Sequence, residues 1–324
     1  MKVKEFSNYR APKRRPWIPV LVFLLVVVAF VWFVRRPRRE TVSEVIAVPV
    51  AATQAGEVVP RMDRPQRRQP PVAVPSVPVA LPGDVSALMQ QAEQHRQADQ
   101  LQAARELYQR ALGLATDASV RAEIEKPLGE IHIALLFSQR PMPEKEAYVI
   151  QRGDQLRLIA RRFGTTVDLI QQGNAITNPD RIRLGDRLRV FRGAFEVVAN
   201  KTRRDMVVYL NGAFFKRYRV GTGEFGKTPV GTFVVRDKIV DPSWWPPDGR
   251  EVPFGHPDNV LGTRWLSIEA TGETPRVRGY GIHGTWEPES IGHEESAGCI
   301  RMLNEEVEEF FLYIPSGTPV RIEE

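Results

Sequence analysis

Three patterns of hydrophobic residues follow one another along the 324-residue chain. Residues 17–34 form an uncharged apolar run about as long as the shortest helices that cross a lipid bilayer. Residues 84–140 carry apolar side chains at helical spacing, and beyond Gly193 the apolar positions alternate with a period of two, as they do in strands. The chain is therefore predicted to be a multidomain protein with one N-terminal transmembrane helix, a helical region and a mainly β domain.

Basic residues flank the apolar run on both sides. Because positive charge favours the cytoplasmic side, the basic tail 1–16 is expected in the cytoplasm and the later domains on the other side of the membrane. No small-residue cleavage site follows the run, so an uncleaved anchor is predicted. Prolines recur throughout residues 35–83 and predict a semi-stiff linker. The basic residues before the run are Lys2, Lys4, Arg10, Lys13, Arg14 and Arg15, and those after it are Arg35, Arg36, Arg38 and Arg39.

The helical region, 84–140, is predicted to hold a pair of helices. The first follows a candidate N-cap at Gly83 and Asp84 and carries apolar residues from Leu88 to Leu112. The second carries apolar residues from Val120 to Leu135, with Pro127 as a kink. This pair resembles one tetratricopeptide unit. Such units need stacked neighbours to bury their apolar faces, so a single unit predicts a packing or pairing role.

Residues 147–191 predict a strand, two helices and a second strand. The first strand holds Tyr148 to Ile150, Gly164 ends the first helix, and the closing strand is predicted from Ile182 to Val190. A resemblance to the LysM family is carried by Tyr148–Asp154, Ile159–Gly164 and Ile182–Leu188. The resemblance implies a small βααβ domain that binds glycan chains containing N-acetylglucosamine, such as those of peptidoglycan.

Residues 194–323 are predicted to form the mainly β domain. Asn211-Gly212 between two alternating runs is the strongest short signal for a hairpin. Glu305–Tyr313 is the one segment that the pattern assigns to a helix. The predicted strands are Met206–Leu210, Ala213–Val220, Val230–Val235 and Trp265–Ile268.

Charge and cysteine content narrow the function only slightly. A net charge of +6 and a pI near 9.5 suit an acidic polymer or a membrane surface, and nucleic acid would satisfy the same electrostatics. The single cysteine, Cys299, excludes an intramolecular disulfide. Cys299 is therefore either a small buried residue or a reactive thiol.

The segment Gly221–Thr228 matches both the phosphate-loop pattern and Gly-x-Gly-x-x-Gly. Both motifs require a helix at the end of the loop. The residues that follow, Pro229–Val235, are rich in β-branched side chains and predict a strand instead. A phosphate-loop enzyme is therefore kept only as a rival hypothesis, and no nucleotide partner is predicted.

The segment around Cys299 has the residues that thiol catalysis requires. A thiolate is the attacking species, and a free thiol is mostly protonated at neutral pH, so a base such as His283 is needed. Gly298 allows the backbone to approach a substrate carbonyl, and the amides around Gly298 and Cys299 are candidates for an oxyanion hole. Arg301 is a candidate for contact with a substrate carboxylate.

A zinc site made of His283, His293 and Cys299 is the main chemical alternative. These residues lack the clustered spacing that zinc sites usually show. No metal or other cofactor is therefore predicted.

The same residues resemble the signature of the L,D-transpeptidase catalytic domain, His283-Gly284 followed by Ser296-x-Gly298-Cys299-x-Arg301. The family implies a β-rich fold with Cys299 as nucleophile and His283 as general base, oriented in many members by a backbone carbonyl. Ser296, Gly298 and Gly284 are carried over as oxyanion or supporting residues and Arg301 as a substrate-binding residue. Many members have histidine where Ala297 stands. Further matches are Gly221-Thr222-Gly223, Lys227–Phe233 and Gly262–Trp265.

This resemblance implies a reaction on the bacterial cell wall. Cys299 would attack the third residue of a donor stem peptide, release the terminal D-alanine and pass the acyl group to an acceptor amine. The expected partners are stem peptides, glycan strands and the membrane, without nucleic acid. The expected location is the inner membrane, with the LysM and catalytic domains in the periplasm. The alternatives are an L,D-carboxypeptidase that uses water as acceptor and a noncatalytic peptidoglycan-binding scaffold with Cys299 merely buried.

Overall fold

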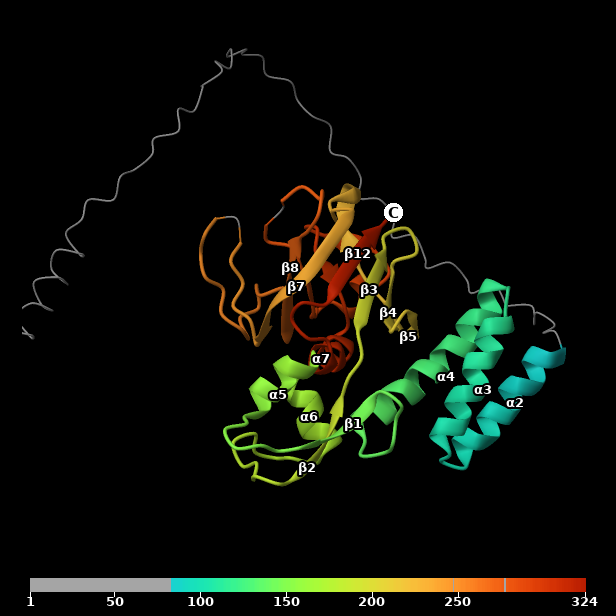
Figure 1. Ribbon diagram of the computed structural model, residues 1–324. Coiled ribbons are helices and arrows are strands. Elements are labelled where there is room, and N and C mark those ends of the chain that lie inside the picture. Colours follow the sequence, from blue (N-terminus) through green and yellow to red (C-terminus); the bar gives the residue numbers. More distant parts are fainter. Residues whose placement is uncertain (1–82, 247, 277) are drawn as a thin grey trace, which may run out of the picture. The chain divides into compact units, whose positions relative to one another are not determined.

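The computed structural model describes residues 83–246, 248–276 and 278–324 (Figure 1). The predicted basic tail, the transmembrane helix and all of the linker except Gly83 lie outside these residues. Within the described ranges, no helix is long and apolar enough to span a bilayer.

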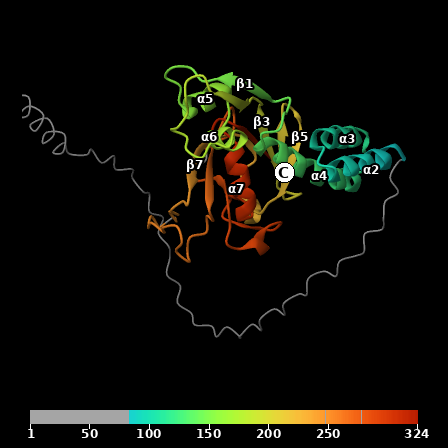
Figure 2. The ribbon, with the colours of Figure 1, turned by 90° about the horizontal axis from the view of Figure 1, so that it is seen from below.

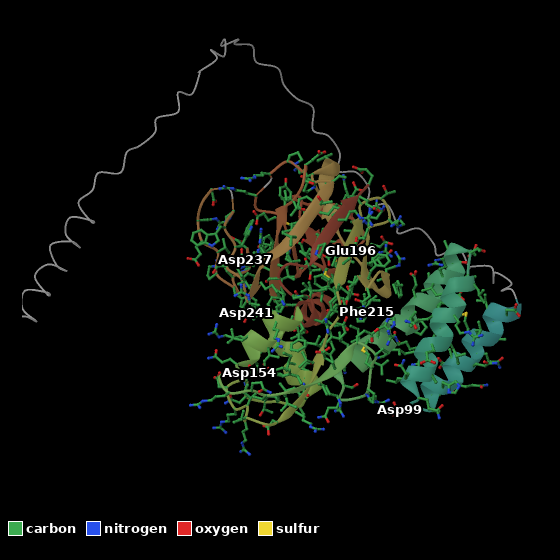
Figure 3. All side chains as sticks on the ribbon, viewed as in Figure 1. Asp99, Asp154, Glu196, Phe215, Asp237 and Asp241 are labelled. Atoms are coloured by element: carbon green, nitrogen blue, oxygen red, sulfur yellow. The ribbon has the colours of Figure 1, made fainter. Side chains whose placement is uncertain are left out.

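Three helices form the helical region, namely α2 (Gly83–Gln97), α3 (Leu101–Leu114) and α4 (Ala118–Phe137). The predicted single helix from Leu88 to Leu112 is therefore wrong. Asp99, at the turn between α2 and α3 (Figure 3), has a left-handed φ of 60°, which a continuing helix does not allow. The chain reverses there, so the region is a helical hairpin followed by a third helix.

Helix α4 joins the helical region to the β domain. The carboxylate of Asp117 caps its N-terminus by accepting hydrogen bonds from the next helical amides, and the helix continues through Pro127. Farther along α4, the buried His132 ring stacks on Phe215 at 5.0 Å between ring centroids. Its Nδ1 also donates to the Phe215 carbonyl at 2.7 Å, and Figure 3 labels Phe215 at this contact between the helices and the sheet.

The LysM region pairs β1 (Lys145–Val149) with β2 (Arg187–Phe191) in antiparallel fashion around α5 (Leu156–Phe163) and α6 (Val167–Gly173). This arrangement confirms the predicted βααβ order. The closing strand begins at Arg187 rather than at Ile182, because Gly185 turns the chain with a φ of 88°. Leu184, which falls within the predicted closing strand, lies in this turn and is 71% exposed. Apolar residues between the two strands and α5 form a core of their own, made of Ile150, Leu156, Ile159, Ala160, Ile170, Leu188 and Val190.

The β domain is built on an eight-stranded sheet with the order β11-β9-β8-β7-β12-β3-β4-β5 (Figures 1 and 2). The predicted hairpin at Asn211-Gly212 is confirmed, since both residues have positive φ and join β4 to β5. Strand β12 lies between β7 and β3, so it joins the two halves of the sheet. The strands are β3 (Phe195–Asn200), β4 (Asp205–Leu210), β5 (Ala213–Arg219), β7 (Gly231–Val240), β8 (Arg264–Ala270), β9 (Gly281–His283), β11 (Ile300–Arg301) and β12 (Pro319–Glu323).

The predicted helix is present as α7 (Asn304–Tyr313). It buries aromatic side chains against the sheet, and the hydroxyls of Tyr218 and Tyr313 hydrogen bond at 2.9 Å. Phe195 and Phe215 pack their rings on Tyr313 from the sheet side. Because α7 follows β11 directly, this packing fixes the strand that carries the residues after Cys299.

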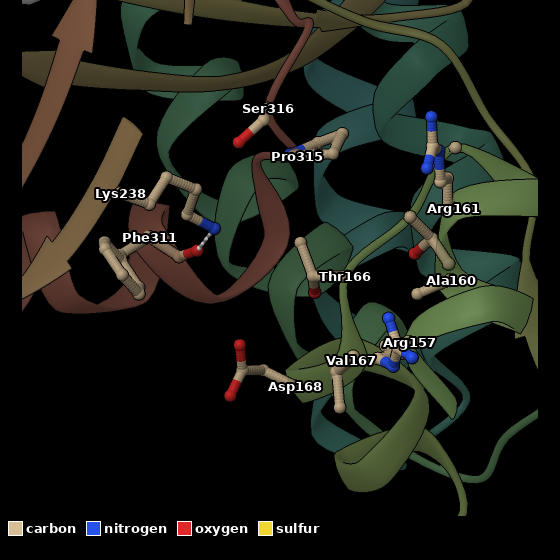
Figure 4. A pocket seen from close by; sticks show the side chains of 12 residues that line it. Arg157, Ala160, Arg161, Thr166, Val167, Asp168, Lys238, Phe311, Pro315 and Ser316 are labelled. Carbon is tan, nitrogen blue, oxygen red and sulfur yellow. Dashed lines mark hydrogen bonds between the residues drawn. The ribbon is translucent and has the colours of Figure 1, made fainter. Parts of the chain in front are cut away.

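The LysM region contacts the β domain through the C-terminal turn of α7. Thr166, the N-cap residue of α6, donates its hydroxyl proton to the Leu312 carbonyl. Within the β domain, Lys238 Nζ on β7 donates to the carbonyls of Phe311 and Ile314 at 2.5 and 2.8 Å. Burial lowers the pKa of Lys238 to about 8. Figure 4 shows the pocket beside this contact, with Arg157 on one side and Lys238 on the other. A specific hydrogen bond from Thr166 therefore joins the two domains in addition to the short link at Arg192.

Candidate active site

Strands β9 and β11 bring the predicted nucleophile and base together. They pair in parallel, with Arg301 opposite His283 and Ile300 opposite Ile282. One residue earlier, Cys299 therefore comes beside Gly281. Because registered neighbours of a parallel pair share one face of a sheet, Arg301 and His283 project from the same side. The register thus brings the bend that carries Cys299 beside the strand that carries His283, although sixteen positions separate the two residues in the chain.

The imidazole of His283 is 3% exposed and held by a backbone carbonyl. Its Nδ1 lies 2.6 Å from the Gly284 oxygen. A carbonyl only accepts hydrogen bonds, so Nδ1 carries the proton and Nε2 keeps its lone pair. Burial lowers the pKa of His283 to about 4, and the Gly284 carbonyl opposes that shift. His283 is therefore neutral at pH 7 and has the tautomer of a base at Nε2.

Trp265 on β8 forms one wall for this imidazole. It is registered opposite His283, and the two rings stack with centroids 5.7 Å apart. A Cβ on Gly281 would lie 2.6 Å from the indole of Trp265, so only glycine leaves room for it. Trp265 was predicted only as part of a strand and of a family match, because no pattern within its own segment indicates this contact.

The thiol group of Cys299 is largely buried, although the residue as a whole is partly exposed. Burial raises its pKa to about 11, while the amide of Gly281 and the positive charge of Arg301 act in the opposite direction. Sγ lies 3.7 Å from the Gly279 carbonyl, toward which it donates weakly. The resting thiol is therefore protonated at neutral pH.

Ser296 organises the turn before the cysteine. Its hydroxyl donates to the Cys299 carbonyl at 2.7 Å and accepts from the Gly298 amide at 3.1 Å. The Gly298 amide is therefore occupied, contrary to its expected place in an oxyanion hole. The predicted supporting role of Ser296 has a structural basis in these two bonds.

Only glycine fits at position 298, because of its backbone conformation and because of the lack of space for a side chain. Its φ is 135°, and a Cβ there would lie 2.5 Å from the ring of Tyr280. On its other side, a Cβ on Gly223 would lie 2.7 Å from the Gly298 Cα. The backbone before Cys299 is thus held between Tyr280 and the segment around Gly223.

That segment is the one that resembled a phosphate loop. Thr222-Gly223 forms the short strand β6, which pairs with β10 (Glu294–Ser296), and Glu224–Gly226 is a single 3-10 turn. The chain then enters strand β7, so the helix that a phosphate loop requires is missing here. The rival phosphate-loop hypothesis is wrong, and the expected strand after the loop is confirmed.

Arg301 lies beside the site with its guanidinium already engaged. Its side chain is 14% exposed, pairs with Glu287 at 3.1 Å and donates to the Glu295 carbonyl at 2.7 Å. The positive charge of Arg301 acts on both the nucleophile and the base, since it lowers the pKa of Cys299 and that of His283. Contact with a substrate carboxylate stays a prediction, and it would have to compete with Glu287.

Gly284 supports His283 through its carbonyl and through its lack of a side chain. A Cβ there would lie 2.1 Å from Asn304 Oδ1, which accepts from the Thr263 amide at 3.1 Å. Asn304, at the start of α7, thereby fixes the backbone that holds the imidazole. Sequence reasoning missed Asn304, because its contact partners lie about twenty and forty residues away.

The zinc alternative finds no support in the described part of the chain. There, no group of three His, Cys, Asp or Glu side chains lies close enough to hold a metal ion. His293 is exposed, whereas His283 is buried with Nδ1 on a carbonyl.

Comparisons with known proteins find relatives for two parts of the chain. A family model described as the L,D-transpeptidase catalytic domain, YkuD, matches residues 194–322, and one described as the LysM domain matches 148–191. The Bacillus subtilis protein YqjB, named as an L,D-transpeptidase, is 41% identical over 127 residues, 39% of this chain and 69% of that protein. The similarly named YkuD of Bacillus licheniformis is 30% identical over 54% of this chain and 97% of its own. Among solved structures, L,D-transpeptidase 3 from Mycobacterium tuberculosis has a TM-score of 0.34 and 20% identity, covering 43% of this chain and 64% of that one.

Proposed function

Because the chain belongs to the L,D-transpeptidase family, with a LysM domain before its catalytic domain, we propose that Cys299 and His283 carry out acyl transfer on peptidoglycan stem peptides. The observation that supports this proposal most is the parallel register of β9 and β11, which brings the bend that carries Cys299 beside the strand of His283. The carbonyl of Gly284 supports it further, since it leaves Nε2 as the base.

In the first half-reaction, His283 Nε2 takes the proton of Cys299 as Sγ attacks the carbonyl carbon of the third stem residue. The tetrahedral intermediate then collapses, the bond to the terminal D-alanine nitrogen breaks, and Nε2 returns the proton to that leaving amine. A thioester and free D-alanine result. The amide of Cys299 itself is the proposed oxyanion donor, because that of Gly298 is bonded to Ser296.

In the second half-reaction, an acceptor amine gives a proton to Nε2 and attacks the thioester. The carbon–sulfur bond breaks, a new amide forms, and the thiol regains its proton from the imidazolium. Water in place of the amine yields a free carboxylate, which is the carboxypeptidase outcome.

The LysM domain is proposed to hold the enzyme on wall glycan. Its contact with the β domain through the hydrogen bond from Thr166 to the end of α7 would then fix the catalytic face relative to the bound strand. Anchoring by residues 17–34 in the inner membrane, with both domains in the periplasm, is proposed from the sequence alone. Extraction of the membrane fraction at alkaline pH tests it, and release of the full-length chain into the supernatant would contradict a spanning anchor.

The reaction is tested with defined disaccharide tetrapeptides and the full-length chain. Intact mass should show an acyl-enzyme that lacks D-alanine, and product analysis should show cross-linked dimer or trimmed tripeptide. Cys299→Ala should abolish the adduct, while His283→Gln should slow its formation strongly. An adduct retained in Cys299→Ala would reject the nucleophile, and a wild-type chain that binds glycan without turnover would favour the scaffold alternative.

A further inference from the structure

The loop beside the cysteine presents an aromatic ring to solvent from a disfavoured backbone conformation. Phe225 is 89% exposed, and its φ of 51° and ψ of 36° are left-handed. Left-handed conformations are rare for aromatic L-residues, because the Cβ crowds the following carbonyl. An exposed apolar ring held in a strained turn has no evident benefit for folding, and such outliers concentrate at functional sites.

The surrounding loop maintains this conformation. The Gly223 amide donates to the Thr228 hydroxyl at 2.7 Å, and the Lys227 amide donates to the Glu224 carbonyl at 3.1 Å. Gly226 follows with a φ of 69°. These bonds close the turn on both sides of Phe225, so its ring is directed outward by the backbone and not by packing of the ring itself.

The position of the loop places this ring at the rim of the catalytic site. Gly223 touches the Gly298 backbone, directly before Cys299, and the Lys227 carbonyl approaches Gly298 from the other end of the turn. Consecutive Cα atoms are about 3.8 Å apart, so Phe225 lies within about 8 Å of the Gly223 Cα. Phe225 therefore lies close to the turn that carries Cys299, within reach of a peptide that extends over several residues from the thiol.

We propose that Phe225 is a specificity-determining residue that contacts the donor stem peptide beside the scissile bond. The ring supplies a rigid apolar surface for the aliphatic part of a stem residue, at little cost in side-chain entropy. Lys227, whose ammonium lies 5.9 Å from the ring centroid and pairs with Glu224, gives this surface a charged border suited to a peptide that carries carboxylates. The inference rests on the proposed function, because it assigns a substrate contact to the same site.

The test separates the ring from the backbone strain. Phe225→Asn and Phe225→Gly remove the ring and fit the left-handed conformation better, whereas Phe225→Tyr keeps the ring. Leu114→Asn removes a similarly exposed apolar side chain from α3 and serves as the matched control. For each full-length variant, kcat and KM are measured with a free tetrapeptide and with a disaccharide tetrapeptide, together with Tm.

The Asn and Gly variants should keep or raise Tm while KM for both donors rises about tenfold, and Tyr and the Leu114 control should match the wild type. An unchanged KM would overturn the proposal, and so would a marked fall in Tm, because the ring would then be structural. A KM effect confined to the disaccharide donor would overturn the peptide assignment in favour of a sugar contact. A wild type that turns over neither donor would instead reject the proposed function.

Discussion

The protonation state of the Cys299–His283 pair gives a quantitative prediction. The pKa of the thiol is raised to about 11 and that of the imidazole is lowered to about 4, in both cases chiefly by burial. At pH 7 the thiolate fraction of such a thiol is ~10⁻⁴, against ~10⁻² for an ordinary cysteine. The resting pair is therefore neutral thiol and neutral imidazole. It differs in this from the thiolate–imidazolium pair of some cysteine enzymes.

Alkylation by iodoacetamide, followed by intact mass in the absence of substrate, measures this state. The rate for Cys299 should rise about tenfold per pH unit from pH 7 to 9.5 without a plateau, because the thiolate fraction rises at that slope below the pKa. His283→Gln should leave this profile nearly unchanged, since a neutral ring contributes no charge to the thiol. The same variant should lose transpeptidation, because the base is gone.

Arg301→Gln provides the opposite perturbation. The positive charge of Arg301 lowers the thiol pKa, so its removal should shift the alkylation profile to higher pH, and Arg96→Gln on α2 is the control. A fast rate that is flat from pH 6 to 9 in the wild type, lost in His283→Gln, would refute the reasoning. It would show that an ion pair forms before substrate binds.

Four further predictions concern stability and geometry. The pKa of the buried His132 is lowered to about 4, so the stability it contributes is complete above pH 6.5 and lost as the pH falls through 4. The loss reaches ~3 kcal/mol, and His132→Phe should remove this part of the pH dependence in urea denaturation between pH 7 and 4, while the part due to the buried His283 remains. Asp117→Ala removes the α4 cap and should cost about 1 kcal/mol in the same assay. Asn304→Ala frees the backbone around Gly284 and should lower kcat about tenfold or more with a smaller change in KM. Gly298→Ala should abolish turnover, because its Cβ would meet the Tyr280 ring, and normal activity would contradict the observed φ.

Local signals in the sequence were sufficient for elements whose conformation is determined locally. The Asn211-Gly212 turn and the helix after Asn304 are where the pattern places them, because turn chemistry and amphipathic spacing act over a few residues. The break between α2 and α3 was missed because the apolar spacing continues across it. The left-handed position there is occupied by Asp99 and not by glycine, which would have indicated a turn. Leu184 was placed in a strand because the apolar residues around it alternate as in a strand, but Gly185 turns the chain there and leaves Leu184 exposed.

The candidate site shows the same division. Cys299 and His283 could be named from residue chemistry, but the contacts that surround the imidazole and its backbone come from segments far apart in the chain, as with Trp265 and Asn304. No periodicity within a segment encodes such contacts, because they depend on register between strands. The occupied amide of Gly298 is a further example, since a hydroxyl two residues earlier decides which donor is free.

The glycines of the former phosphate-loop candidate illustrate why spacing alone is ambiguous. In a phosphate loop, glycines expose amides to an anion at a helix N-terminus. Here Gly221 is needed because a Cβ would lie 2.8 Å from the Ser290 carbonyl, and Gly223 because it touches Gly298. Gly226 is needed for its positive φ. The glycines thus allow the backbone of residues 221–226 to pack closely against the turn that carries Cys299. Any side chain at position 223 should therefore displace Cys299, even without contact between that side chain and the substrate.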